Sequence, residues 1–407
     1  MADWLLRFVQ AGDFHLELPL SGLAEIPPQL RDVLVDAPFQ AAEGVFHAAL
    51  SEGVDFLVLC GDLLDAVRTG PRGPRFLQEQ FERLAEREIA VYWAGGPVDP
   101  VEAWPEVVPL PENVHRFPTA EVAEFLFDRG ARPPVRLLGR GRGEEARLRP
   151  GEFRPPDDAH FTIAVAHGKA PAAALERAGV DAWALGGRHT AKTLRTEPAF
   201  IHYAGSPQGR KPTETGPHGG TLVEVDGHGR VRQRMLPTNT VRWCDERIVL
   251  PADARRSDLE HEIDERTARL TAAAGETELL IRWTILAEGP LLTDLRRGTL
   301  AVELVNAHRT RSAGRPGAWS VDLVAGPAGG IPDAWYRQES VRGDFLRSLA
   351  ALAESGAPPI GEDDLPEGID AELAEALLCC QGAARSRLLE EAAQWGADRL
   401  TAEGGTP

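Results

Sequence analysis

The stretch "VDFLVLCGD", residues 54–62, is a short apolar run that ends in a glycine and a carboxylate. A continuous run of valine, leucine and phenylalanine is typical of a strand covered on both faces of a sheet. An ionised Asp62 at the end of such a strand is costly unless a cation lies close to it. The stretch therefore predicts a buried strand that delivers a carboxylate to a charged site.

The same alternation continues from residue 5 to about residue 231. Helical patterns at 38–51, 76–87, 119–127 and 170–178 separate apolar runs. Strands that alternate with helices predict a layered α/β domain with crossover helices. The predicted strands lie in "LLRFVQAG", "VDFLVLCGD", "IAVYWAGG", "VRLLGRG", "FTIAVAHG", "AWALGG", "FIHYAGS" and "TLVEVDG".

The pattern changes after residue 240. Helices at 258–271 and 291–297 and strands in "ELLIRWTILAEG", "LAVELVN" and "WSVDLVA" predict a small α+β domain. Helical patterns at 340–353 and 370–400 follow. We therefore expect three parts with the bounds 1–240, 241–335 and 336–407.

Composition limits the classes of function and the location. A net charge of −18 argues against a wholly basic coat for nucleic acid, although it leaves room for a local basic groove. The longest apolar runs are far shorter than the roughly 20 residues that span a bilayer, and the N-terminus lacks the features of a secretory signal. We expect no membrane partner and a cytoplasmic protein.

Ligand-type side chains follow several predicted strands. In "AGDFHL", Asp13 and His15 stand two apart, so in extended backbone they would face the same way. A carboxylate beside an imidazole suits a borderline divalent metal ion. Each residue alone could serve only local hydrogen bonds, but the carboxyl edge of an α/β sheet is where ligands bind. The residues at these strand ends are Asp13, His15, Asp62, Asp99, His167 and His189.

The order of these motifs resembles that of the calcineurin-like metallophosphoesterases. D-x-H is present at 13–15, G-D-x-x-D at 61–65 and H-G at 167–168, while "GPVD" (96–99) and "GGRH" (186–189) stand where the family has G-N-H-D and G-H-x-H. The stretch "YAGSPQGRKPTETGPHGGTLVEV", residues 203–225, is similar to the SbcD/YhaO-like branch of DNA-repair exonucleases.

The resemblance implies a four-layer α/β/β/α metallophosphoesterase sandwich that holds two Mn²⁺ ions. It also implies a small α+β cap domain that recognises DNA, and C-terminal helices that dock on an SbcC-type or YhaN-type SMC ATPase. A homodimer is a further possible assembly, although the sequence does not decide the oligomeric state.

Carried over residue by residue, the resemblance assigns the first metal to Asp13, His15, Asp62 and His189. The second metal would take Asp62 as a bridge, His167, an asparagine and a further histidine. Asp99 would support the ligands without binding a metal.

The sequence departs from the family at three places. Pro97 replaces the asparagine ligand, Val98 replaces the catalytic histidine, and Gly187 replaces a histidine of the second metal. None of these side chains has a lone pair to donate. We therefore expect one well-formed metal site, a weak second site and reduced hydrolysis.

Three basic residues have open roles. Arg188 is either a cation that compensates for the missing ligand or an ordinary loop arginine facing solvent. Arg210 and Lys211 in "GSPQGRKP" form the best local basic pair for a nucleic-acid backbone.

Three functions stay open at this level. The first is a metal-dependent DNA exonuclease or phosphodiesterase with reduced activity. The second is a pseudo-nuclease, a catalytically inactive metal-binding subunit of an SMC-type ATPase. The third is a phosphoesterase for a small nucleotide, so whether the protein is an enzyme is not decided by its sequence.

Overall fold

The computed structural model describes residues 4–26, 28–128, 130, 133–142, 147–158, 160–312, 317–327, 331–356, 360–361, 365 and 382–402. The chain divides into two compact units. One holds Met1–Glu246, Glu265–Arg282 and Asn306–Asp322, and the other holds Arg247–Asp264, Trp283–Val305 and Leu323–Pro407. The predicted domain bounds at 240 and 335 stay a prediction.

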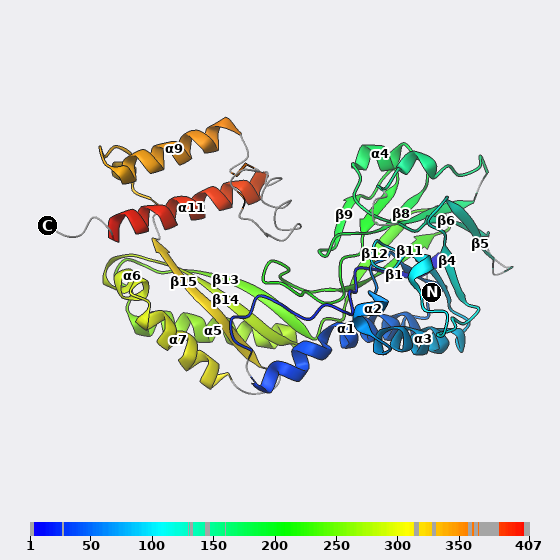
Figure 1. Cartoon of the computed structure of the whole chain (residues 1–407), viewed down its shortest axis with the longest axis horizontal. Helices are drawn as coiled ribbons and strands as arrows, with labels where there is room; N and C mark the ends of the chain where they lie inside the picture. The colour runs from blue at the N-terminus through cyan, green and yellow to red at the C-terminus, as the bar shows by residue number, and fades with distance from the viewer. Residues whose placement is uncertain are drawn as a thin grey trace. The chain divides into compact units, whose positions relative to one another are not determined.

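One of the two large sheets of the larger unit is a six-stranded mixed sheet (Figure 1). Its strand order is β12-β11-β1-β2-β3-β4. The strands β1 to β4 run parallel to one another, while β11 pairs antiparallel with both β1 and β12. The bounds are β1 (Trp4–Ala11), β2 (Phe56–Leu59), β3 (Ala90–Ala94), β4 (Val114–Phe117), β11 (Gly219–Asp226) and β12 (Val231–Pro237).

A second six-stranded mixed sheet has the order β5-β6-β7-β8-β10-β9. Its central strands β6, β7, β8 and β10 are parallel, and the edge strands β5 and β9 are antiparallel to their neighbours. The bounds are β5 (Ala123–Phe127), β6 (Val135–Arg140), β7 (Phe161–His167), β8 (Ala182–Gly186), β9 (Lys192–Arg195) and β10 (Phe200–Tyr203).

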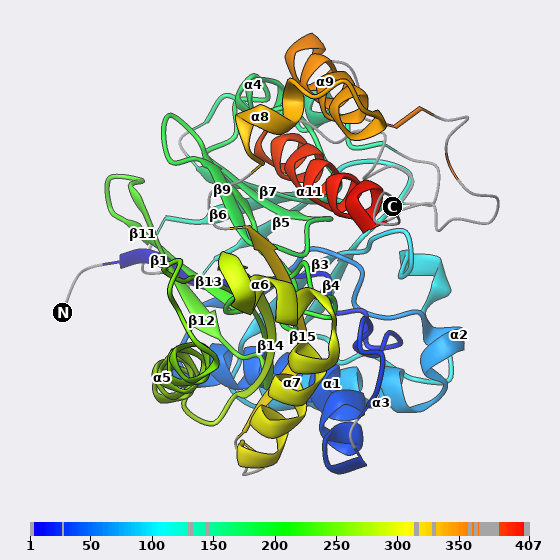
Figure 2. The ribbon, with the colours of Figure 1, turned by 90° about the vertical axis from the view of Figure 1, so that its left-hand side faces the viewer.

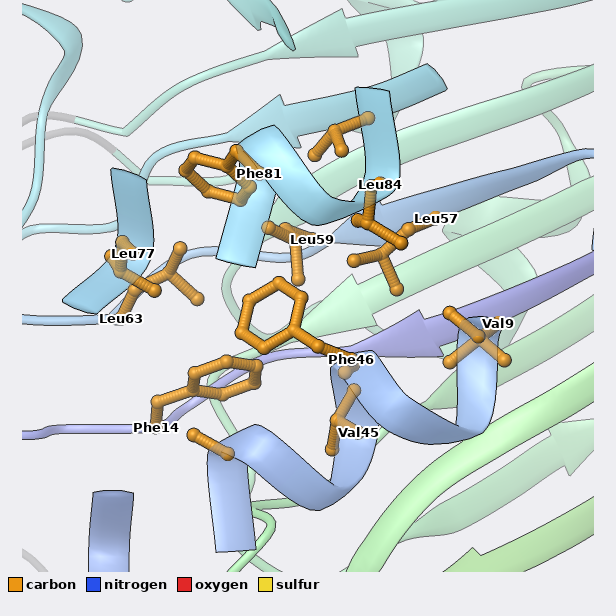
Figure 3. Packing of buried hydrophobic residues seen from close by; sticks show 14 of the residues in the cluster. Val9, Phe14, Val45, Phe46, Leu57, Leu59, Leu63, Leu77, Phe81 and Leu84 are labelled. Atoms are coloured by element: carbon orange, nitrogen blue, oxygen red, sulfur yellow. The ribbon is translucent and has the colours of Figure 1, made fainter. Parts of the chain in front are cut away.

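Helices cover the outer face of the first sheet. Phe46 of α1 (Arg31–Ser51) and Phe81 of α3 (Arg72–Ala85) belong to one buried cluster with Val9, Leu57 and Leu59 of the strands. Figure 3 shows these side chains pointing toward one another from the helices and the sheet. Burying each large apolar side chain contributes about 1.5–3 kcal/mol to the free energy of unfolding, so this cluster stabilises the packing of the helices on the sheet.

The two sheets pack face to face through a second cluster. Phe8 and Phe56 come from the first sheet, and Val165 and Ala184 come from the second. Gln10 lies in this dry interface, and its side-chain amide donates to the carbonyls of Leu185 (3.3 Å) and His202 (3.0 Å). A polar side chain of β1 thus bonds directly to the backbone of the opposite sheet.

The outer face of the second sheet carries the short helix α4 (Ala172–Glu176). Its Leu175 lies in a cluster with Trp183 and Ile201, and the Trp183 indole donates to the Leu175 carbonyl at 3.0 Å. By their contacts the layers run helix, sheet, sheet, helix. The larger unit is therefore an α/β fold with mixed sheets, and every strand predicted before residue 227 is confirmed.

The predicted helix at 119–127 is wrong, because residues Ala123–Phe127 form strand β5. Glu124 and Leu126 are exposed while Phe125 and Phe127 are half-buried, a period of two that fits a strand. Antiparallel pairing with β6 provides the backbone partners. A short apolar run with a few charges does not separate helix from edge strand by periodicity alone.

The predicted strand at 300–306 is also wrong, because helix α7 spans Thr299–Arg311. Leu304 and His308 stand four apart, and both are buried. That spacing places them on one face of a helix. The apolar run is therefore one stripe of a longer amphipathic element.

The remaining elements include a three-stranded sheet with the order β13-β14-β15. Within the first unit, Leu30 and Leu34 form a cluster with Trp243 and Leu280. The bounds are β13 (Val241–Val249), β14 (Glu278–Ala287), β15 (Ala318–Pro327), α2 (Ala66–Thr69), α5 (Arg256–Ala274), α6 (Gly289–Arg296) and α8 (Asp333–Tyr336).

Two C-terminal helices lie side by side in the second unit (Figure 2). Leu346 of α9 (Val341–Ser355) packs against Ala393 and Ala397 of α11 (Gly382–Ala402). Small alanine side chains let the helices approach closely. They also bury little apolar surface, so the hydrophobic contact between the helices is small. The predicted helical residues 370–381 lie outside the described part of the chain.

Candidate metal centre

Loops at the ends of four strands bring the predicted ligands together. Asp13 follows β1, Asp62 follows β2, His167 ends β7 and His189 follows β8. The ligand atoms of Asp13, His15 and His189 lie within 4.8 Å of one another, and so do those of Asp13, Asp62 and His167. Asp13 is common to both groups, so the two candidate metal sites overlap.

The backbone at three of these residues is unusual. Asp13, His15 and Asp62 have φ values of 53°, 46° and 52°, in the left-handed region that non-glycine residues rarely adopt. The expectation that Asp13 and His15 lie in extended backbone is therefore wrong, because β1 ends at Ala11. Such strain persists where the surrounding structure over-determines the conformation, and it clusters at functional sites.

Main-chain hydrogen bonds hold these two loops against each other. The Asp13 amide donates to the Gly61 carbonyl at 2.8 Å, and the His15 amide donates to the Asp62 carbonyl at 3.0 Å. The Gly187 amide reaches both carboxylate oxygens of Asp13, at 3.0 and 2.9 Å. The carboxylate of Asp13 is thus fixed in place before any ligand binds.

His167 lies between the two buried carboxylates. Its Nε2 is 3.3 Å from Asp13 Oδ1 and 3.2 Å from Asp62 Oδ2. Burial opposes protonation, but the two carboxylates outweigh it and raise the pKa of His167 to about 10. Burial alone would also raise the pKa of Asp62, yet His167 lowers it. The position is built for a cation, which a proton supplies when no metal is bound.

His15 offers a direct test of whether a metal fits these residues. Its Nε2 is buried, has no hydrogen-bond partner in the part of the chain that the structure describes, and lies 3.7 Å from Asp62 Oδ2. A buried ring nitrogen without a partner is costly unless a ligand satisfies it. The donor set of carboxylates and imidazoles therefore fits a divalent metal ion.

Glu17 is a residue that the sequence did not point out. Its Oε1 lies 3.3 Å from His15 Nδ1, and its Oε2 accepts the Asp65 amide at 3.0 Å. Burial would raise the pKa of Glu17, but the hydrogen bond with His15 lowers it. A carboxylate on one ring nitrogen fixes the tautomer and leaves the other nitrogen for a metal. The spacing D-x-H-x-E was the signal that could have found it.

Glu214 plays the same part for His189 and was also missed. Its Oε1 lies 2.7 Å from His189 Nδ1, and its Oε2 accepts the Arg210 amide at 2.7 Å. Burial would raise the pKa of Glu214, but the hydrogen bonds from His189 and Arg210 lower it to about 2. No sequence spacing links Glu214 to His189, since 25 residues separate them.

Part of the larger unit is similar to known proteins. Residues 6–191 match the model of the calcineurin-like phosphoesterase family. This segment is therefore similar to the calcineurin-like metallophosphoesterases. The chain is also 31% identical over 252 residues to the uncharacterized metallophosphoesterase YhaO of Bacillus subtilis strain 168. That alignment covers 58% of this chain and 62% of the relative, which is less than two thirds of its length.

Two solved structures resemble the chain more remotely. GAP50, the anchor in the inner membrane complex of Plasmodium, has a TM-score of 0.36 and 13% identity over 57% of this chain and 84% of its own. Vacuolar protein sorting 29 from Cryptosporidium parvum has a TM-score of 0.28 and 16% identity over 58% of this chain and 100% of its own.

The Asp99 carboxylate accepts hydrogen bonds from main-chain amides. It accepts the amides of Asp62 (2.8 Å), Leu63 (3.0 Å) and Gly96 (2.6 Å), and the indole N–H of Trp93 (3.2 Å). Burial and the nearby Asp62 carboxylate raise the pKa of Asp99 to about 7. Asp99 therefore positions the Asp62 loop.

The turn at residues 96–99 lies beside Asp62. It offers a backbone amide to Asp62 at the place where the resembled family has side-chain ligands. The Val98 amide donates to Asp62 Oδ1 at 3.3 Å. A Cβ on Gly96 would lie 2.1 Å from the same oxygen, so only glycine lets the turn come this close. Pro97 adds no N–H to the set. On this side of the candidate metal centre, Asp62 thus receives a main-chain donor.

The backbone conformation at residue 187 explains why this position is a glycine. Its φ is +92°, and a Cβ there would lie 3.2 Å from the Gly168 nitrogen and 3.3 Å from His167 Cε1. A histidine at this position would be strained and crowded. The glycine instead brings its amide to Asp13, as described above.

The three basic residues predicted to have open roles, Arg188, Arg210 and Lys211, lie in different surroundings. The Arg188 guanidinium lies over the Tyr203 ring, 4.9 Å from its centroid. Arg210 is 3% exposed, and its Nη2 is 3.2 Å from both ring nitrogens of His189. Lys211 is half-buried. Arg210 thus contacts a candidate metal ligand.

Among the described residues, none of the helices is both long enough and apolar enough to cross a bilayer.

Proposed function

We propose that this protein is an SbcD/YhaO-like, metal-dependent phosphodiesterase that cleaves DNA, with turnover reduced by the loss of the second-metal ligands. The observation that carries the proposal is the pair of overlapping ligand groups that share Asp13. Loops from the two sheets bring carboxylates and imidazoles together in one buried cluster. Apolar residues would stabilise the fold at least as well as buried charged groups, so the cluster indicates a functional site.

Asp13, His15, Asp62, His167 and His189 would hold the metal, for which we propose Mn²⁺. A bound divalent ion polarises a phosphoryl oxygen and lowers the pKa of a bound water. Glu17 and Glu214 orient the rings of His15 and His189 through their Nδ1 atoms. The Val98 amide stabilises the charge on Asp62 but cannot donate a proton to a leaving group, so the step helped by general acid catalysis slows by roughly 10²- to 10⁴-fold.

The second candidate function is a pseudo-nuclease that binds metal without turnover. Pro97, Val98 and Gly187 favour it, because each stands where the resembled family uses a functional side chain. Both candidate functions include a bound metal ion, and they differ only in whether the protein hydrolyses a phosphodiester. Activity measured beside metal content therefore separates them.

The test combines elemental analysis with Mn²⁺-dependent cleavage of linear DNA and of a simple aryl phosphodiester. We expect bound metal and slow DNA cleavage that Asp62→Asn abolishes, while Asp36→Asn, which alters an exposed ion pair with Arg72, changes neither. Metal content without turnover above the Asp62→Asn background would support the pseudo-nuclease. Cleavage of the aryl ester alone would contradict a DNA substrate.

We also propose that the C-terminal helices dock on an SbcC-type or YhaN-type SMC ATPase. Trp395 of α11 is 70% exposed, and Val341 of α9 is 71% exposed. Exposed aromatic side chains are common anchors of protein interfaces. Co-purification with such an ATPase should be lost when residues 336–407 are removed and should weaken in Trp395→Ala. An intact complex after the truncation would contradict this partner site.

A further inference from the structure

The tyrosine that ends β10 gathers positively charged residues of the larger unit. The Arg188 guanidinium lies over the Tyr203 ring, 4.9 Å from its centroid. Lys192 is the residue of β9 that pairs with Tyr203, and residues that pair across an antiparallel ladder point to the same face of the sheet. The adjacent pair follows this rule, since Thr193 Oγ1 bonds to the ring of its partner His202 at 3.0 Å. Two cations therefore lie beside the same tyrosine.

The hydroxyl of Tyr203 also fixes the segment that carries Lys169. It donates to the Gly168 carbonyl at 3.2 Å and accepts the Ala170 amide at 3.4 Å. Both chain neighbours of Lys169 are thus tied to the tyrosine that holds the other two cations. We call the three charged residues around this tyrosine the cation cluster: Lys169, Arg188 and Lys192.

The three side chains of the cation cluster have no carboxylate partner among the residues that the structure describes. By contrast, Arg195 at the other end of β9 pairs with Glu176 at 3.0 Å. The Nε of Arg188 is buried and also lacks a hydrogen-bond partner in the described chain. A buried donor without a partner costs free energy, and cations that are gathered together repel one another. An anion bound among them would relieve both costs.

Lysine is rare in this chain, and the lysines are not scattered. Only three of the 44 lysine and arginine residues are lysines, and two of the three, Lys169 and Lys192, belong to the cation cluster. The third, Lys211, follows Arg210, whose Nη2 is 3.2 Å from both ring nitrogens of His189. A lysine ammonium is a flexible point charge that meets phosphate oxygens without a fixed geometry. Lysine at this place therefore suits a polyanion whose phosphates are not held in one arrangement.

The cation cluster borders the candidate metal centre. Arg188 directly precedes His189, and Lys169 stands two residues after His167. Strands β7, β8 and β10 end and β9 begins at this edge of the second sheet, in the order β7-β8-β10-β9. Because neighbouring strands are about 4.8 Å apart, the cluster extends over roughly 14 Å, which is longer than one phosphate group. It therefore suits successive phosphates of a chain better than a single phosphate.

We propose that the cation cluster binds backbone phosphates of a DNA strand, next to the phosphodiester that lies at the metal centre. The inference rests on the proposed function and names the residues that hold the substrate beyond the cleaved bond. Lys169, Arg188 and Lys192 neutralise backbone charge, while the metal ligands hold the reacting group. Contacts with phosphates carry no base sequence, so this binding is independent of sequence.

The test measures binding without cleavage. A fluorescently labelled oligothymidylate is titrated with the whole chain in the presence of a chelator, and its anisotropy is followed over a series of salt concentrations. For single strands, each phosphate contact adds about 0.7 to the steepness of the plot of log affinity against log salt concentration. We expect Lys169→Ala, Arg188→Ala and Lys192→Ala each to reduce this slope by about 0.7 and to weaken binding about fivefold at about 0.1 M salt. Both lysines are exposed, so their variants keep the test valid should Arg188→Ala not fold.

Two substitutions serve as controls. Arg195→Ala removes a positive charge from the same strand and should keep the slope of the parent, since Arg195 pairs with Glu176. Lys192→Arg keeps the charge of the cluster and should also keep the slope. Thymidine monophosphate should displace the oligonucleotide only weakly. Parent-like slopes in both lysine-to-alanine variants, or displacement by the mononucleotide at equal concentration, overturn the inference.

The two proposals fail in different ways. In the Asp62→Asn background, which should not cleave, Lys192→Ala should still reduce the slope. Reduced slopes in the cluster variants of a protein that cleaves no DNA would refute the proposed activity and leave the cation cluster. Cleavage of DNA by a protein whose slope is unchanged by these substitutions would refute the cation cluster and leave the activity.

Discussion

At the scale of the single residue, the candidate ligands depend on neighbours that do not touch the metal position. His189 is held through Nδ1 by Glu214, and His15 is held in the same way by Glu17. Both carboxylates keep a lowered pKa in spite of burial, since each accepts a hydrogen bond from its histidine. Residues of this kind set the tautomer and direction of the ring that binds.

Replacing Glu214 with glutamine should therefore weaken metal binding by about 10- to 100-fold, the usual effect of removing such a partner. The amide keeps the shape but no longer supplies the negative charge that favours His189. Equilibrium dialysis with Mn²⁺ measures the change. Glu79→Gln, which alters an exposed pair with Arg75, should bind metal like the parent. Equal affinities in both variants would show that Glu214 only packs.

At the scale of the element, the loop after β2 and the turn after β3 behave as one structure. The Asp99 carboxylate ties the amides of Asp62, Leu63 and Gly96 together. Gly61 and Gly96 meet so closely that a Cβ on Gly61 would lie 2.5 Å from the Gly96 nitrogen. Two backbone segments in such contact fix the direction of the Asp62 side chain.

Gly96→Ala should disturb this contact. Its Cβ would meet Asp62 Oδ1 at 2.1 Å, so the turn or the carboxylate must move. We expect a loss of about 1–3 kcal/mol in the free energy of unfolding, as for other overpacked sites, together with weaker metal binding. Denaturant unfolding measures the first effect. Gly227→Ala, where a Cβ meets nothing within 4 Å, is the control and should be close to neutral.

The sequence predicted the strands and the polar residues at their ends because a buried strand and a polar strand end leave strong local patterns; that these residues bind a metal stays a prediction. It did not predict the left-handed backbone at Asp13, His15 and Asp62, since no glycine marks those positions. It missed Glu17 and Glu214 because acidic residues are common on every surface. It misassigned β5 and α7 because tertiary pairing decided between two elements that a short apolar run allows.

At the scale of the whole molecule, His202 makes its own contribution to the dependence of stability on pH. His202 lies between Thr193 and Thr221, each 3.0 Å from one ring nitrogen, and burial lowers the pKa of His202 to about 4. The unfolded chain takes up this proton near its ordinary pKa of about 6.5, but the folded chain does not. The contribution of His202 is therefore fully present above about pH 6.5 and is lost as the pH falls toward 4.

Between pH 7 and pH 5 this group alone should remove about 2 kcal/mol from the free energy of unfolding. His202→Asn should lower stability at pH 7 and should remove this loss of about 2 kcal/mol between pH 7 and pH 5, while the opposite contributions of Asp99 and His167, whose pKa values are raised, remain. Denaturant unfolding at the two pH values gives the slope. His47→Asn, at an exposed position, should keep the slope of the parent. A parent slope in His202→Asn would mean that other groups carry the acid sensitivity.

The division of the ligands between the two sheets has a mechanical meaning. Asp13 and Asp62 belong to one sheet, while His167 and His189 belong to the other. An ion bound to both would act as a reversible cross-link at this edge, in addition to the apolar contacts and the hydrogen bonds of Gln10 and His202 that join the two sheets. Local opening at that edge would then require release of the ion, so added metal should slow amide exchange at the ends of β2 and β7 together.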